Sequence, residues 1–184
     1  MDGELIRAEI KVPGQHQITN TLAAVRVAKL LGLDMEQMTR GIASVVPIAG
    51  RNRIIQEGNF TLIDDCYNAN PVSMKAALDL LSLADTRKVA ILGDMFELGE
   101  NSDLLHSGVG CYAKGKTDLL ICIGENAKHI YDGAKEAGVA HIYHFTDKES
   151  FLREKENLLQ AGDTILLKAS HGMAFETLIS QLLQ

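Results

Sequence analysis

From residue 61 to the end of the chain, short apolar runs alternate with longer segments in which apolar residues recur every three or four positions. The first pattern is typical of buried strands, and the second of helices that turn one face to a core. The expected strands span 61–63, 89–93, 119–124, 141–145 and 164–169, and the expected helices span 71–84, 102–113, 126–137, 148–160 and 173–183. The alternation predicts an α/β fold with a doubly wound, mostly parallel, Rossmann-like sheet and right-handed crossovers.

The junction at residues 61–84 carries the strongest local signals. Pro71 has no amide hydrogen and a φ already suited to a first helical turn, so it marks a helix start. Asn70, directly before it, is kept out of the helical conformation and can cap the free amides with its side chain. We expect the helix to turn one apolar face to the sheet, formed by Ala76, Ala77, Leu80, Leu81 and Ala84.

The pattern before residue 53 is different. Residues 5–12 alternate in polarity and predict a strand. An alanine-rich helix follows over 21–31 and ends at Gly32, where a helix C-terminal glycine is expected. Asp34 then caps a second helix that runs to about residue 42, with Gln37 at the capping-box position. Two helices and one strand are too little for a core of their own.

Residues 47–51, Pro-Ile-Ala-Gly-Arg, read as a linker. We therefore expect a small α-rich part over 1–48 and an α/β domain over 49–184. Residues 53–64 predict two strands joined by a tight turn at Glu57-Gly58-Asn59, a hairpin that leads into the sheet.

Composition narrows the class of partner. The chain has 184 residues, 46% of them hydrophobic and 23% charged, with a formal net charge of −6. This composition is ordinary for a globular protein, and the chain has no excess of positive charge. We therefore expect neither nucleic acid nor an anionic membrane surface as partner. Cys66, Cys111 and Cys122 make no C-x-x-C pair, which suits a reducing cytosol and core-filling roles. We expect a cytoplasmic monomer without membrane insertion.

Polar groups follow four of the expected strands: Asp64 and Asp65, Asp94 and Glu97, Glu125 and Asn126, and Lys168, Ser170 and His171. The carboxyl ends of parallel strands share one edge, so these side chains should converge there. The aspartate pair can accept hydrogen bonds from a nucleotide ribose, bind a metal, or cap loop amides. Lys168 can meet a phosphate or carboxylate, or extend from the sheet edge into water.

Three further positions have two interpretations each. Arg51, at the expected boundary, can reach a nucleotide γ-phosphate across a cleft or remain in solvent. His16 and Asn20 can face one ligand, or they can be a turn histidine and a helix N-cap. His106 and His129 read as surface histidines. We expect no phosphate-binding loop of the G-x-x-x-x-G-K-[ST] type.

One family matches these segments in order. The motifs are G-x-H-x-x-x-N from Gly14, G-R at residues 50–51, IDDCYNANPVSMKAAL from Ile63, LGDMFELG from Leu92, HSGVG from His106 and LLKASHGMAFE from Leu166. Together they resemble the end of the central domain and the whole C-terminal domain of the Mur ligases. Within that family the resemblance is to ligases that add D-alanyl-D-alanine to UDP-N-acetylmuramoyl-tripeptide in peptidoglycan precursor synthesis.

The resemblance implies an ATP-dependent amide ligase that works through an acyl phosphate. It places His16 and Asn20 near the adenine, Arg51 at the phosphates in a catalytic role, and Asp65 at the ribose. It also places around the dipeptide Tyr67, Asn68, Asn70, Lys168, Ser170 and His171. No metal ligand is expected in this chain, because the Mg²⁺ ligands and the P-loop of these ligases belong to the preceding part, so the chain should be inactive alone.

Two alternatives compete with this interpretation. The chain can be a stand-alone module that binds a nucleotide or a dipeptide without catalysis. It can also be a phosphoacceptor receiver domain, in which Asp94 is the target aspartate and Lys168 the strand-end lysine. The order of the strands that carry these residues argues against the receiver domain.

Overall fold

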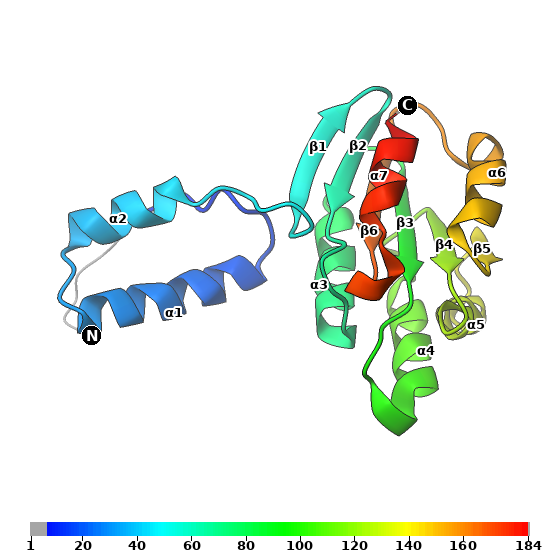
Figure 1. Cartoon of the computed structure of the whole chain (residues 1–184), viewed down its shortest axis with the longest axis horizontal. Coiled ribbons are helices and arrows are strands. Elements are labelled where there is room, and N and C mark those ends of the chain that lie inside the picture. Colours follow the sequence, from blue (N-terminus) through cyan, green and yellow to red (C-terminus); the bar gives the residue numbers. More distant parts are fainter. Residues whose placement is uncertain (1–6, 184) are drawn as a thin grey trace.

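A six-stranded sheet forms the centre of the protein in a computed structural model that describes residues 7–183 (Figure 1). The strand order is β1-β2-β6-β3-β4-β5. The strands are β1 (Arg53–Glu57), β2 (Phe60–Asp64), β3 (Lys88–Gly93), β4 (Leu119–Ile123), β5 (Ile142–Phe145) and β6 (Thr164–Lys168). Only the β1–β2 hairpin is antiparallel, and every other neighbouring pair is parallel. The mostly parallel α/β sheet is confirmed.

Helices cover both faces of the sheet, as a doubly wound fold requires. One core contains side chains of α3 (Pro71–Leu81), α4 (Ser102–Tyr112) and α5 (Ala127–Ala137), including Met74, Val109 and Ile130. The opposite core contains side chains of α6 (Lys148–Leu158) and α7 (Glu176–Leu182), including Phe151 and Leu178. Strand residues alternate between the two cores, and most strand interiors are therefore fully buried.

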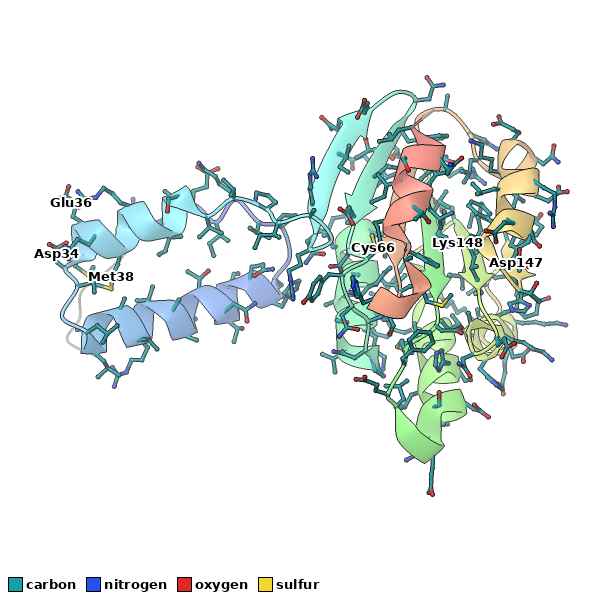
Figure 2. All side chains as sticks on the ribbon, viewed as in Figure 1. Asp34, Glu36, Met38, Cys66, Asp147 and Lys148 are labelled. Atoms are coloured by element: carbon teal, nitrogen blue, oxygen red, sulfur yellow. The ribbon has the colours of Figure 1, made fainter. Side chains whose placement is uncertain are left out.

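Helices α1 (His16–Leu30) and α2 (Met35–Ser44) form a pair that projects from the sheet on the side of β1 (Figure 1). Among the described residues of this pair, Met38 alone is buried. Met38 lies on the side of α2 that faces α1 (Figure 2). Several apolar side chains of α1 and of the residue after it are more than half exposed: Leu22, Val27, Leu30 and Leu31.

The strongest local signals are confirmed. The Asn70 side chain accepts a hydrogen bond from the Ser73 amide at 2.9 Å, and Pro71 opens α3. Asp34 and Gln37 form the expected capping box of α2. Gly32 has a φ of +84° just after α1, and Gly58-Asn59 close the β1–β2 hairpin.

Several expectations are wrong in detail. Part of the strand expected at 5–12 lies outside the described residues, and residues 7–12 form no strand, since no described strand lies beside them to pair with. α1 begins at His16, so Asn20 is inside the helix and is not its N-cap. The face that α3 turns to the core is only partly as expected: Ala77 and Leu81 are buried and Leu80 packs against the core, but Met74 and Leu78 complete the buried face in place of Ala76 and Ala84. Cys111 is exposed, although Cys66 and Cys122 do fill the core.

Candidate ligand sites

A cavity of about 790 Å³ lies where the start of α1, the linker, the end of β2 and the start of α3 meet. The parallel pairing of β2 and β6 brings the ends of these strands to this edge, as the sequence predicted. The linker reaches the same edge because β1, which follows it, is antiparallel to β2. The cavity contains eight of the expected site residues: His16, Asn20, Arg51, Asp65, Tyr67, Asn68, Asn70 and Lys168. Residues that sequence reasoning did not select include Gln17, Asn52 and Leu105.

Asp65 and Lys168 form a buried ion pair at the ends of adjacent strands, with 2.6 Å between Lys168 Nζ and Asp65 Oδ2. The Lys168 ammonium also donates to the Asn68 carbonyl at 2.9 Å. Its side chain is 2% exposed, so Lys168 does not extend into solvent. Burial raises the pKa of the Asp65 carboxyl, and the Lys168 ammonium opposes that rise. The pair therefore joins the two strand ends at the cavity.

Asp64 has a structural role that differs from that of its neighbour. Its Oδ2 accepts from the Gly50 amide at 2.8 Å, and its Oδ1 accepts from the Cys66 thiol at 2.7 Å. Gly50 has a φ of +76°, and an added Cβ there would lie 3.0 Å from the Tyr67 nitrogen. Asp64 thus ties the linker to the sheet, and of the two aspartates only Asp65 is left at the cavity.

Asn52 links the linker to α1. Its Nδ2 donates to Nε2 of His16 at 3.1 Å, and Gln17 Nε2 lies at the same distance from that nitrogen. Since both neighbours are donors, His16 Nε2 accepts and the ring proton is on Nδ1. Asn52 is 5% exposed with a φ of +51°, and its buried Oδ1 has no hydrogen-bond partner in the described part of the chain. An unpaired buried acceptor at a cavity wall is a position for a ligand donor.

Arg51 and His171 both contact the ring of Tyr67, Arg51 over its face and His171 at a tilt of 39° between the ring planes. The Arg51 guanidinium lies 4.0 Å from the Tyr67 ring centroid, and the Tyr67 and His171 ring centroids are 5.7 Å apart. Arg51 has no ion-pair partner among residues 7–183. Its forked donors are therefore free for an anion, while the aromatic ring fixes their position.

A second cavity of about 440 Å³ adjoins the first. Tyr67, Asn68 and Asn70 line both cavities, whereas Ser170 and His171 line only the second. Lys168 lines only the first. The remaining wall comes from Phe96, Glu97 and Leu98, in the loop after β3. The structure therefore divides the expected site residues between two neighbouring cavities with a common wall.

Loop 94–98 is held by consecutive backbone hydrogen bonds. The Asp94 carbonyl accepts from the Ser170 amide at 2.9 Å, and the Phe96 amide donates to Ser170 Oγ at 2.8 Å. Between them, the Met95 amide donates to His106 Nε2 at 2.9 Å. His106 is fully buried, so the expected surface position is wrong, because both ring nitrogens are needed to bridge this loop to Ser102 at 2.8 Å.

The Asp94 carboxylate is hydrogen-bonded to the start of α5. Its Oδ1 accepts from the Ala127 amide at 2.6 Å, and the side chain is 5% exposed. Lys168 pairs with Asp65 rather than with Asp94. A receiver domain needs an accessible target aspartate, so this arrangement removes that alternative.

The letters of a phosphate-binding loop do occur, at Gly110–Thr117 (GCYAKGKT), so the expectation that this pattern is absent is wrong. Their context is the reverse of a P-loop, because Gly110 lies in α4 and the segment leads into β4, whereas a P-loop joins a strand to a helix. A Cβ at Gly110 would lie 1.9 Å from the Ile130 carbonyl oxygen. This glycine serves the packing of α4 on α5.

Residues 7–183 contain neither a cluster of metal ligands nor a membrane-spanning helix. No group of three or more His, Cys, Asp or Glu side chains in this range is placed to hold a metal ion. No helix in the same range has the length and apolar character needed to cross a bilayer.

With this geometry established, comparison with known proteins identifies the class. Residues 50–171 match the family described as Mur ligase, glutamate ligase domain. The match covers well over half of the chain, so the chain belongs to the Mur ligase family.

The most similar relatives point to one branch of that family. The UDP-N-acetylmuramoyl-tripeptide–D-alanyl-D-alanine ligase of Bacillus subtilis is 31% identical over 180 residues, which are 95% of this chain and 39% of that ligase. The enzyme of the same name from Synechocystis is 37% identical over 193 residues, covering 100% of this chain and 42% of that ligase. The chain thus spans about two fifths of the length of these relatives.

Solved structures agree with this relationship. A crystal structure of MurF from Acinetobacter baumannii superposes with a TM-score of 0.86 at 30% identity, covering 96% of this chain and 39% of that chain. A MurF ligase of Thermotoga maritima, solved in complex with ADP, has the same fold, with a TM-score of 0.79 at 24% identity.

Proposed function

We propose that this chain is part of an ATP-dependent ligase that joins D-alanyl-D-alanine to UDP-N-acetylmuramoyl-tripeptide, and that it contacts both the nucleotide and the incoming dipeptide. The single observation that supports it best is the pair of adjoining cavities, one with a free guanidinium and the other with small polar side chains. Such a ligase needs a phosphoryl donor and an amine on two sides of one acyl group. The named activity of the relatives supports the same assignment.

The larger cavity is the nucleotide side. His16 and Asn20 would contact the adenine and Asp65 the ribose hydroxyls, since a carboxylate held on one side by Lys168 keeps free lone pairs for a hydroxyl donor. Arg51 would bind the phosphates, because its fork matches phosphoryl oxygens. The unpaired Oδ1 of Asn52 supports a bound ligand with a donor group at this wall.

The smaller cavity is the dipeptide side. Tyr67, Asn68, Asn70, Ser170 and His171 line it and offer hydroxyl, amide and imidazole donors for a carboxylate. Lys168 would act on this side through the Asn68 carbonyl that its ammonium binds, rather than through contact with the dipeptide.

The resemblance to the Mur ligases implies the reaction, and the two cavities would hold its nucleotide and its amine. The tripeptide carboxylate attacks the γ-phosphorus of ATP and releases ADP, which leaves an acyl phosphate. The dipeptide amine then attacks the acyl carbon, loses a proton and expels inorganic phosphate. Arg51 would stabilise the charge on the transferred phosphoryl group. Mg²⁺ would assist ATP when bound, and its ligands would come from outside residues 7–183, where no group of carboxylates is placed to hold it.

The proposed domain boundary near residue 48 implies that this chain carries only part of an active site. We assign residues 1–48 to the end of the ATP-binding central domain and 49–184 to the C-terminal domain. The exposed apolar residues of α1, and those at Val45, Val46 and Ile48 after α2, support this assignment, since an apolar surface of that extent is normally covered. The phosphate-binding loop would then come from outside this chain, which would make the chain inactive alone.

Chemical-shift mapping of the 184-residue chain tests the two sites. Added ATP should perturb amides of residues 14–20 and 50–52, and added D-alanyl-D-alanine should perturb residues 94–98 and 170–172. Shifts confined to other surfaces would contradict the assignment. Nucleotide binding with no response to the dipeptide would favour the stand-alone nucleotide module.

A further inference from the structure

We propose that Glu97 binds the ammonium group of the incoming dipeptide and thereby selects ligands with a free amine. This inference rests on the proposed function of the smaller cavity. Glu97 lies in the loop after β3 and was noted in the sequence only as a strand-end carboxylate. The structure gives three separate reasons to assign it a ligand.

The backbone at Glu97 is strained. Its φ is +62°, a left-handed conformation that non-glycine residues rarely adopt. The preceding residues are fixed to Ser170 and His106, so the loop cannot relax without breaking those hydrogen bonds. Strain of this kind persists where the surroundings impose it, and it concentrates at ligand sites.

The Glu97 carboxylate is also unpaired. It lines the smaller cavity, and no hydrogen-bond donor or cation within residues 7–183 contacts it. The other titratable group on that wall besides the Tyr67 phenol is His171, whose imidazole contacts the ring of Tyr67. Glu97 is exposed, so its carboxylate is open to solvent, and the strained backbone fixes it at the cavity wall, where a cationic ligand group can reach it.

The groups that line the cavity can complement a zwitterion. A free dipeptide carries one ammonium and one carboxylate group, and the cavity offers one carboxylate together with the imidazole of His171 and the hydroxyl of Ser170. An ammonium–carboxylate contact is a charge-assisted hydrogen bond, among the stronger kinds in proteins. The same negative charge disfavours phosphate groups here and leaves them to the Arg51 side.

This inference is tested by removing the Glu97 charge from the protein and, separately, the ammonium charge from the ligand. The dissociation constants of D-alanyl-D-alanine and N-acetyl-D-alanyl-D-alanine are measured by calorimetry for the 184-residue chain and for Glu97→Gln. Glu97→Gln should weaken binding of the free dipeptide about tenfold or more, the size expected for one hydrogen bond to a charged group. Binding of the acetylated dipeptide should change less than about twofold, because it has no ammonium group to lose.

Glu100→Gln is the matched control, since Glu100 is exposed nearby and does not line the cavity. It should bind both ligands like the unmodified chain. Glu97→Gly is a second variant, which suits the left-handed backbone and should fold while losing the preference for a free amine.

Equal binding of the free dipeptide by the unmodified chain and Glu97→Gln would overturn the inference and leave the proposed function intact. Equal losses for both ligands would also overturn it. Failure of every variant, the unmodified chain included, to bind the dipeptide would overturn both this inference and the dipeptide site itself.

Discussion

The Arg51 guanidinium lies over the ring of Tyr67, with 4.0 Å between Arg51 Cζ and the ring centroid. Tyr67 lines both cavities, and its other neighbour, His171, lines only the smaller one. One aromatic side chain therefore positions the proposed phosphate-binding group on one side and forms a wall of the proposed amine site on the other. This arrangement leads to the first prediction.

Tyr67→Leu should weaken ATP binding to the chain about two- to fivefold, the equivalent of one exposed cation–π contact of about 0.5–1 kcal/mol. Tyr67→Phe keeps the ring and should bind ATP like the unmodified chain. Calorimetric titration with ATP measures both. Equal losses in the two variants would assign the effect to the phenol hydroxyl rather than to the stack.

Lys168→Met should lower the free energy of unfolding by about 3–5 kcal/mol, because it leaves the Asp65 carboxylate buried without its cation. The double variant Asp65→Leu/Lys168→Met should recover much of that loss, since no unpaired charge remains. Urea unfolding followed by circular dichroism measures both. A Lys168→Met variant as stable as the unmodified chain would mean that the ion pair contributes nothing.

Asn70→Ala should lower the free energy of unfolding by about 0.5–2 kcal/mol, the usual loss for an N-cap. Asn70→Ser restores a capping oxygen and should recover this stability. If the Asn70 amide also contacts the dipeptide, both variants should bind D-alanyl-D-alanine more weakly. A dipeptide affinity that is normal in both variants would restrict Asn70 to the capping of α3.

The stability contributed by Asp147 should depend on pH. Asp147 caps α6, away from α1 and the linker (Figure 2), and hydrogen bonds from Ser150 lower the pKa of its carboxyl below the ordinary value of 3.8. A depressed folded-state pKa stabilises the fold fully above the unfolded pKa, and the contribution is lost as the pH falls through the folded pKa.

Asp147→Asn keeps a capping oxygen without the charge. The difference in unfolding free energy between the unmodified chain and Asp147→Asn should therefore be constant above pH 3.8 and shrink below it. Urea unfolding at a series of pH values measures this difference. A difference that grows on acidification would contradict the cap assignment.

The fold could be predicted from the sequence because apolar runs and helix caps are local signals. Asn70 with Pro71, and Asp34 with Gln37, gave two helix starts correctly. His106 and Asn52 could not be placed this way, since their burial depends on hydrogen bonds to Met95 and His16, which come from other segments. A single asparagine after G-R, and a histidine seven residues after a glycine, carry no local pattern.

The arrangement of Asp65 and Lys168 could be predicted only in part. Their convergence at one sheet edge followed from parallel strand ends, but the 2.6 Å ion pair depends on the adjacency of β2 and β6, which a linear pattern does not specify. The division of the site into two cavities likewise depends on the position of Tyr67 between Arg51 and His171.

The measurement that tests the central claim most directly is ligation by a fusion in which this chain replaces the matching segment of the Bacillus subtilis ligase. The fusion should consume ATP and D-alanyl-D-alanine in equal amounts and form the tripeptide–dipeptide amide with release of ADP and phosphate. Arg51→Ala in the same fusion should fold normally and lose this activity. A folded fusion that binds ATP and the dipeptide yet forms no amide would contradict the account.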